Sequence, residues 1–194
     1  YTSVIQLTGK KIGVVTGSIG DQVALDSIKD PKLEYFNSVA DLGTALDGDK
    51  IDAYVVNNVI ALFMADTYPD HADIASLTKE DYAFCFAKSK PDLRNQFNEY
   101  LENIESDGTL DTYVKKWITT NPGDANVDYS GLKDKNGHLT MSISSDIGAP
   151  FVYLKDGRWV GLDMEIAVGF CLEYGYGLTV NVTSFGGMLA DIST

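Results

Sequence analysis

The stretch "GVVTGSIGDQ", residues 13–22, has the residue types that hold a small anion at the start of a helix. The apolar run at 12–15 is rich in β-branched residues and indicates a short buried strand. Gly17 then permits a tight turn, Ser18 is a favoured N-cap residue, and Asp21 completes an arrangement close to a capping box. The pattern predicts a strand, a turn and a helix N-terminus whose unpaired N–H groups suit a phosphate or a carboxylate.

Two established phosphate-binding patterns do not occur in this turn. A Walker A loop ends in Gly-Lys-Ser or Gly-Lys-Thr, and the dinucleotide fingerprint needs three spaced glycines. An ordinary βα turn, whose polar residues only satisfy the helix, therefore stays open as the alternative to an anion site.

Two acids, Asp163 and Glu165, stand near a predicted helix start in "GLDMEIA". Paired carboxylates suit a glycosidase or a metal site, but residues two apart on a helix point to different faces. We expect these two acids to stabilise the helix dipole rather than to catalyse a reaction.

The histidines and cysteines do not form a catalytic or metal-binding pattern. His71 and His138 are isolated in the sequence, which predicts neither a zinc site nor a His-based catalytic set. Cys85 and Cys171 lie in apolar contexts, which favours buried free thiols, while a single disulfide between them stays open. We therefore expect no metal and no cofactor.

The composition is that of a globular protein with an acidic surface. The 194 residues suffice for one large or two small domains, with 44% hydrophobic and 22% charged residues. A formal net charge of −13 argues against nucleic acid or an anionic membrane surface as a partner. No run approaches the roughly 18 apolar residues of a membrane span, and residues 1–11 lack the pattern of a signal peptide. Any parts for export or anchoring are expected outside this sequence.

Strand and helix patterns alternate along the first part of the chain, which predicts an α/β fold with a mainly parallel sheet. After the opening unit, strands are predicted at 32–36, 51–56, 74–77 and 81–88, and helices at 37–50 and 57–69.

The later part of the chain is expected to repeat this pattern after a polar break. Helices are predicted at 91–108 and 109–118, and residues 119–138, rich in Asn, Asp, Gly and Lys, read as a linker and a domain boundary. Beyond them we expect a strand at 139–144, a hairpin at 151–161 turned by Asp156 and Gly157, a helix at 162–175, a strand at 178–184 and a helix start at 185–194.

At these positions the chain resembles the extracellular solute-binding proteins of ABC transporters, in the class that binds polar amino acids. The segments "LTGKKIGVVTGS", "VADLGTALDGDKIDAYVVNN" and "ESDGTLDTYVKKWI" resemble the second half of a family member, over residues 7–118. The segments "LTMSISSDIGAPFVYLKDGRWVGLDMEIA" and "FGGMLADIST" resemble the beginning of another, over residues 139–194. This order indicates a piece of a tandem array.

The resemblance implies two-lobed, periplasmic-binding-protein-like modules and the following domains. Residues 1–87 would be the second lobe of one module, 88–118 helices that return to a first lobe, 119–138 a linker, and 139–194 the first half of the first lobe of the next module. We expect 1–87 to carry its own sheet and the helices of 91–118 to pack against 139–194. A strand-exchanged dimer is the alternative, because unpaired strand edges favour it.

The function implied by the resemblance is binding of a small polar amino acid, without catalysis, for an ABC importer. The partner would be an ABC permease, possibly fused in the parent chain, and the place would be the extracellular side of a membrane to which the parent is anchored. A sensing module of a membrane receptor and a dehydratase-type enzyme on the same fold are the alternatives.

The resemblance also implies ligand-binding residues. In the first of the two modules, the turn at Thr16, Gly17 and Ser18 would donate hydrogen bonds to the ligand's α-carboxylate. Asn57 stands where the family commonly has an aspartate for the ligand's ammonium, and capping the following helix is its alternative role. In the next module the corresponding residues would be Ser145 or Asp146 as the polar partner and Phe151 as an apolar wall, with a core role for Phe151 equally open.

Overall fold

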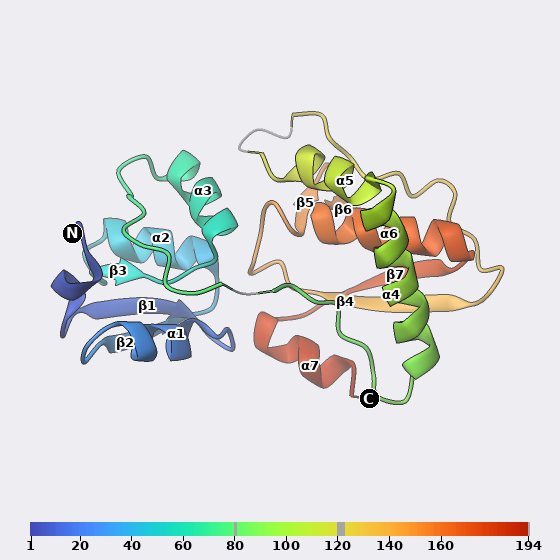
Figure 1. Cartoon of the computed structure of the whole chain (residues 1–194). Helices are drawn as coiled ribbons and strands as arrows, with labels where there is room; N and C mark the ends of the chain where they lie inside the picture. The colour runs from blue at the N-terminus through green and yellow to red at the C-terminus, as the bar shows by residue number, and fades with distance from the viewer. Residues whose placement is uncertain (80, 120–122, 194) are drawn as a thin grey trace. The chain divides into compact units, whose positions relative to one another are not determined.

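The computed structural model describes residues 1–79, 81–119 and 123–193, which form two compact units (Figure 1). Unit 1 comprises Tyr1–Tyr82, and unit 2 comprises Ala83–Thr194. Each unit contains parallel strands and helices that pack on them, so the predicted α/β class is confirmed.

Unit 1 is built on a three-stranded parallel sheet with the order β2-β1-β3. Since β1 lies between the other two strands, the chain leaves it in one direction for β2 and crosses back over it for β3. Right-handed crossovers then place α1 and α2 on opposite faces of the sheet (Figure 1). The elements are η1 (Val4–Leu7), β1 (Lys11–Val15), α1 (Gly20–Ser27), β2 (Lys32–Phe36), α2 (Val39–Asp47), β3 (Ala53–Tyr54) and α3 (Asn58–Thr67).

The central strand β1 is buried on both faces, as its run of apolar residues predicts. Ile12 and Val14 are fully buried with Ala24 of α1. A Cβ at Gly13 would lie 2.6 Å from the Ile51 side chain and 2.8 Å from that of Leu42, so the opposite face needs a glycine at this point. The two faces together hold β1, and with it the turn that follows it, in place.

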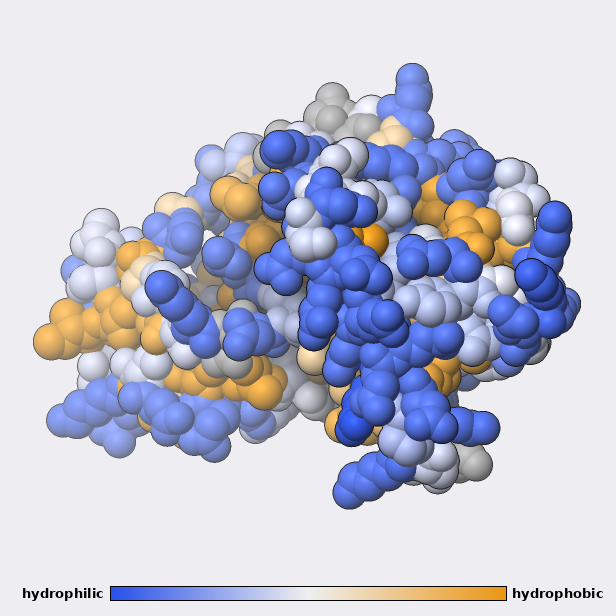
Figure 2. Space-filling model, turned by 45° about the vertical axis from the view of Figure 1, so that its right-hand side comes forward, coloured by the Kyte–Doolittle hydropathy of each residue, from blue (hydrophilic) through white to orange (hydrophobic). Residues whose placement is uncertain are grey.

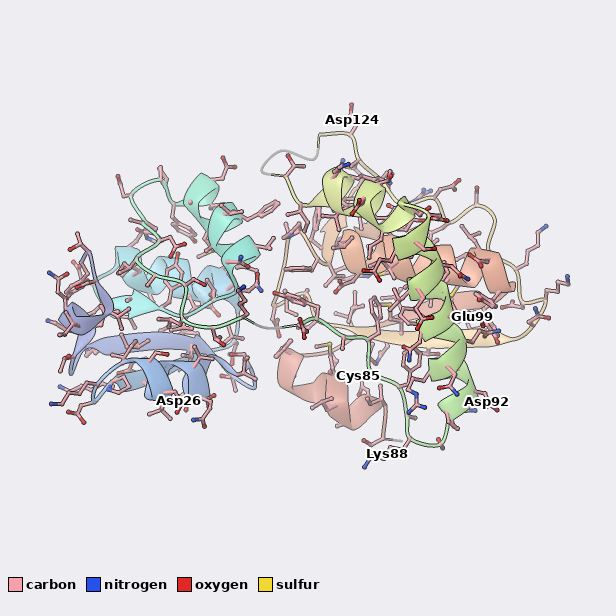
Figure 3. All side chains as sticks on the ribbon, in the orientation of Figure 1. Asp26, Cys85, Lys88, Asp92, Glu99 and Asp124 are labelled. Atoms are coloured by element: carbon pink, nitrogen blue, oxygen red, sulfur yellow. The ribbon has the colours of Figure 1, made fainter. Side chains whose placement is uncertain are left out.

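The last two strands predicted in this part of the chain are not formed. The described residues of 74–77 and 81–88 carry no strand, although the second segment has the apolar alternation of one. Phe84 and Phe86 pack against Phe97, whereas Cys85 between them is exposed (Figure 3). The unit boundary therefore falls at 82–83, and residues 83–87 pack with unit 2 rather than with the expected lobe 1–87.

Unit 2 contains a parallel pair, β4 and β7, joined by the helix α6, and an antiparallel hairpin, β5–β6. Figure 1 shows α6 and α7 on opposite sides of β4 and β7. The elements are α4 (Pro91–Ser106), α5 (Thr109–Trp117), β4 (His138–Ile143), β5 (Tyr153–Lys155), β6 (Arg158–Val160), α6 (Leu162–Tyr174), β7 (Gly177–Val182), η2 (Phe185–Gly187) and α7 (Met188–Asp191).

The helices α4 and α5 pack against α6, in agreement with the packing expected between 91–118 and 139–194. Phe97, Tyr100 and Ile104 of α4 form one buried cluster with Phe170 and other residues of α6. The hydrophobic core of unit 2 thus joins elements from both sides of the polar segment 119–138.

That polar segment is not a boundary between compact units. Its described residues from 123 to 137 have no helix or strand, as expected, but Val127 is buried in the core of unit 2. The Lys155 ammonium donates to the carbonyl oxygens of Gly123 and Ala125 at 2.6 and 2.9 Å. The segment is therefore packed against unit 2, which its polar composition did not predict.

Both cysteines are free, and only Cys171 is buried as expected. Burial raises the pKa of the Cys171 thiol to about 11, so this thiol is protonated at neutral pH. Figure 2 shows a mainly hydrophilic face with smaller hydrophobic patches, in keeping with the acidic composition. Within the described parts of the chain, the membrane-span criterion of a long, sufficiently apolar helix is not met.

Replacement of Leu42 by alanine tests the core of unit 1. Leu42 is fully buried on α2 and contacts the strand at Gly13. We expect Leu42→Ala to lower the free energy of unfolding of unit 1 by about 2–5 kcal/mol, measured by urea denaturation with circular dichroism. Leu62→Ala is the control, since Leu62 is 58% exposed and its loss is expected to change stability by less than about 0.5 kcal/mol.

Candidate functional site

The carboxyl ends of β1 and β3 form the candidate site of unit 1. The three strands are parallel, so the loops that follow them lie on one edge of the sheet. The strand order reverses between β1 and β3, and open α/β sheets bind ligands outside the carboxyl ends of the strands at such a switch point. The loops at this point are residues 16–19 and 55–57.

The turn at 16–19 is largely exposed, and hydrogen bonds to β1 and β2 hold it in place. Both the backbone N–H and the hydroxyl of Thr16 donate to the Phe36 carbonyl oxygen of β2, at 2.8 and 3.0 Å. Gly17 has a φ of 82°, a conformation that a side chain disfavours. The Ser18 hydroxyl donates to the Val15 carbonyl oxygen at 2.7 Å and accepts from the N–H of Gly20 at 3.1 Å.

The expected capping box at Ser18 and Asp21 is wrong. The helix α1 begins at Gly20, and its N-cap is Ile19, which makes no side-chain hydrogen bond to the helix. Ser18 is committed to the turn because its hydroxyl bridges back to Val15, and the Asp21 carboxylate instead accepts the Tyr35 hydroxyl at 3.3 Å. The turn is therefore one residue longer than the sequence pattern predicted.

This longer turn leaves backbone donors open to solvent. Among the described residues, no acceptor is recorded for the N–H groups of Gly17 and Ile19, and both residues are exposed. The N-terminus of α1 adds a partial positive charge at the same place. Sequence reasoning did not identify Ile19, because an apolar side chain carries no signal for a backbone donor.

Asn57, at the end of the loop after β3, caps α3. Its side-chain oxygen accepts from the N–H groups of Val59 and Ile60 at 2.7 and 3.4 Å. The capping alternative is thus confirmed, while contact of Asn57 with a ligand stays a prediction. Across the switch point, a Cβ at Gly20 would lie 3.5 Å from the Val55 carbonyl oxygen, so the start of α1 and the end of β3 are close together.

The residues predicted for the second module lie in unit 2 and have different environments. The Asp146 carboxylate accepts the N–H of Phe185, at the start of η2, at 3.1 Å. Ser145 is exposed, and Phe151 is 6% exposed, as its core alternative expects. Ligand contact by these three residues remains a prediction.

The two acids of "GLDMEIA" have separate environments. The Glu165 carboxylate accepts the Lys116 ammonium at 2.6 Å and the Trp117 indole N–H at 2.9 Å, which is more than the expected support of the helix dipole. Burial raises the pKa of Asp163 to about 7, and no described residue donates a hydrogen bond to its carboxylate. A single acid without a partner does not form the paired carboxylates of a glycosidase.

Both histidines, although isolated in the sequence, have polar partners in the fold. His71 contacts Asp47 and the Tyr54 hydroxyl through its two ring nitrogens, at 2.9 and 3.1 Å. His138 contacts Asp134 and the Thr179 hydroxyl, both at 2.6 Å. No group of three metal-ligating side chains occurs in the part of the chain that the structure describes.

Several curated proteins are similar to this chain, and their names are those of amino acid-binding proteins. The ABC transporter glutamine-binding protein GlnH of Bacillus subtilis is 29% identical over 60% of this chain and 43% of its own length. The putative ABC transporter arginine-binding protein 2 of Escherichia coli is 26% identical over 61% of this chain and 51% of its own length. A probable histidine-binding protein of Campylobacter jejuni is 31% identical over 57% and 44%.

The comparison of structures agrees with that of sequences. An ancestral arginine-binding protein bound to arginine matches 61% of this chain and 55% of its own, with a TM-score of 0.53 and 28% identity. The resemblance to amino acid-binding proteins of ABC transporters and the periplasmic-binding-protein-like fold are thereby confirmed. These names describe binding proteins, which agrees with the expectation of a non-catalytic function.

The match is partial in length. This chain spans about half the length of the curated relatives it matches, between 43% and 51%. No protein-family model matches the chain.

Substitutions of Asn57 test its capping role in the ligand-free protein. We expect Asn57→Ala to lower the free energy of unfolding of the ligand-free protein by about 1 kcal/mol, because α3 loses its cap. Asn57→Asp keeps the acceptor oxygen and serves as the matched control in the same urea titration. Equal stability of all three proteins would show that the cap contributes nothing.

The raised pKa of Asp163 predicts a dependence of stability on pH. The folded protein keeps this proton up to a pKa of about 7, whereas the unfolded chain releases it near 3.8, so the folded state binds more protons in between. Stability therefore falls as the pH rises through this window. We expect Asp163→Asn to flatten the change in the urea midpoint between about pH 5 and pH 8, and an unaltered slope would contradict the burial of this carboxyl.

Proposed function

We propose that this chain is part of an amino acid-binding protein that delivers its ligand to an ABC importer. The ligand class is a small polar amino acid, held through its α-carboxylate by the turn at 16–19. No bond of the ligand is made or broken in this process, since a carboxylate needs only hydrogen-bond donors and a complementary charge.

The observation that carries the proposal is the pair of unpaired N–H groups at Gly17 and Ile19. They stand on an exposed turn at the switch point of the sheet, beside the N-terminus of α1. A carboxylate carries one negative charge and two acceptor oxygens, which such a turn accommodates without a lysine. A phosphate group carries more negative charge than a carboxylate, and this turn has no lysine to neutralise it.

The names of the relatives support the ligand class. The similar proteins are named for glutamine, arginine and histidine, three amino acids with different side chains and the same α-carboxylate. A site that recognises the shared group suits all three, so the side-chain preference of this chain would be set by residues outside the turn.

The proposal includes the tandem order of modules. Residues 1–87 would be the second lobe of one module, and residues 139–194 would begin the first lobe of the next. The order of the family-like segments along the chain supports this assignment. Ser145, Asp146 and Phe151 would then belong to the binding site of the following module.

The proposed place of action is the extracellular side of a membrane, with an ABC permease as partner. One of the similar proteins is named an arginine-binding extracellular protein, ArtP of Bacillus subtilis, at 28% identity. Membrane anchoring would depend on parts of the parent protein other than the residues described here.

This chain would contain only parts of two modules, so calorimetry of a parent protein with complete modules tests the proposal, with amino acids and their α-amides as ligands. We expect L-glutamine, L-arginine or L-histidine to raise the midpoint of thermal unfolding by mass action, and the matching α-amide, which lacks the carboxylate, to have no such effect. A shift of the same size with acid and amide, or no shift with any amino acid, would contradict the proposed site.

A substitution at Ile19 tests the turn itself. Ile19 has a φ of −79°, which proline adopts, and Ile19→Pro removes the N–H without adding charge. We expect this variant to lose about tenfold or more in affinity, as for one charge-assisted hydrogen bond. Ile19→Val keeps the N–H and is the control, and circular dichroism of both variants checks that α1 is retained.

A further inference from the structure

A pocket of about 400 Å³ lies on the surface of unit 2. It is lined by residues 128–130 of the polar segment, residues 157–159 of the β5–β6 hairpin and Val180 of β7. None of the residues proposed above to bind an amino acid takes part in this lining. The pocket is therefore a separate candidate site, and its chemistry follows from the side chains that line it.

The hairpin side and the segment side of the pocket are held together. The turn of the hairpin consists of Asp156 and Gly157, which have positive φ angles of 49° and 76°. Two-residue turns of this kind match the twist of the strands and fix their register. The Tyr129 hydroxyl of the polar segment donates to the Trp159 carbonyl oxygen of β6 at 2.5 Å. This bond joins the two sides directly and favours a preformed site.

Arg158 gives the pocket a cation without a protein partner. It lies opposite Lys155 in the hairpin, and the Lys155 ammonium binds the carbonyl oxygens of Gly123 and Ala125. For the exposed guanidinium of Arg158, in contrast, no hydrogen bond or ion pair is recorded with any described residue. A guanidinium presents several N–H donors in one plane, which suits a carboxylate.

Asp128 gives the same pocket an anion. Its carboxylate accepts the N–H of Ser130 at 2.9 Å. Hydrogen bonds from Ser130 hold the pKa of the Asp128 carboxyl below its usual range, and the positive charge of Arg158 lowers it further. The structure records no ion pair between Asp128 and Arg158, although both line the pocket. The pocket thus offers one anion and one cation that do not neutralise each other by direct contact.

The rest of the lining is largely apolar. Tyr129, Trp159 and Val180 are partly buried, pack against the core of unit 2 and contribute their remaining surface to the pocket. Aromatic side chains offer flat faces and edges against which another ring packs favourably. An apolar wall beside an anion and a cation suits a ligand that carries a ring, an ammonium and a carboxylate.

We propose that this pocket binds a small zwitterion with a planar apolar side group, of the class of the aromatic amino acids. The carboxylate of the ligand lies against Arg158, its ammonium against Asp128, and its ring against Trp159 and Tyr129. A ligand with a single charge leaves one of the two pocket charges without a partner and binds more weakly. Because the ligand bridges the polar segment and the hairpin, it also strengthens the attachment of residues 123–137 to unit 2.

Titration of this chain with L-phenylalanine tests the proposal. The chain has two tryptophans, of which Trp117 is completely buried, so a change in fluorescence reports mainly on Trp159. We expect a saturable change with a dissociation constant on the order of 1 mM. We expect weaker binding of 3-phenylpropanoate, which lacks the ammonium, and of 2-phenylethylamine, which lacks the carboxylate. The absence of saturation with L-phenylalanine would overturn the site.

Two substitutions assign the charges of the ligand to their partners. Arg158→Gln is expected to weaken the binding of L-phenylalanine and 3-phenylpropanoate severalfold, but not that of 2-phenylethylamine. Asp128→Asn keeps an oxygen for the Ser130 N–H and is expected to weaken the binding of L-phenylalanine and 2-phenylethylamine instead. Arg94→Gln is the matched control, since Arg94 is exposed on α4 and does not line the pocket. Equal effects on all three ligands, or none, would contradict the assigned contacts.

The variant Ile19→Pro distinguishes this pocket from the turn of unit 1. We expect L-phenylalanine to bind this variant as it binds the unmodified chain. Loss of binding would assign the ligand to the turn at 16–19 and would overturn the pocket. Binding at the pocket that persists while complete modules bind no amino acid at Gly17 and Ile19 would contradict only the function proposed above.

Discussion

The parallel pairing of β1 with β2 on one side and β3 on the other is the constraint on which the site of unit 1 depends. It places the turn at 16–19 beside the end of β3, and it sends α1 and α2 to opposite faces of the sheet. The hydrogen bonds from Thr16 to Phe36 extend this pairing into the turn. The donors at Gly17 and Ile19 are thus held by the sheet, although they belong to a loop, and this preorganisation favours a ligand that needs only donors.

The periodicity of the sequence predicted most elements of both units, and local chemistry explains where it did not. Short apolar runs bounded by glycine or serine became strands, and the Ser38 side chain caps α2. The segment 81–88 has the alternation of a strand, but alternation shows only that a chain is extended, and pairing needs a partner. Residues 123–137 look like a linker because their packing depends on a few side chains, such as Val127.

The position of the candidate site after β1 could be predicted from the sequence, but its unpaired backbone atoms could not. The glycine at 17 and the hydroxyl at 18 correctly indicated a tight turn after β1. Which N–H groups are left unpaired depends on the Ser18 hydroxyl, which donates to the Val15 carbonyl oxygen and accepts from the Gly20 N–H instead of accepting from that of Asp21. Glu165 was assigned to the helix dipole because its partners, Lys116 and Trp117, lie almost fifty residues earlier in the chain, a separation that local patterns do not encode.

The strand β2 is the outer strand of the sheet in unit 1, and no other described strand pairs with its free side. A free edge of this kind offers its backbone to any extended chain in solution, which is a common route to fibres. Lys32 and Glu34 are both exposed on this short strand and stay hydrated only when it is uncovered. These two charges therefore disfavour the addition of a second strand, which would have to displace water from both.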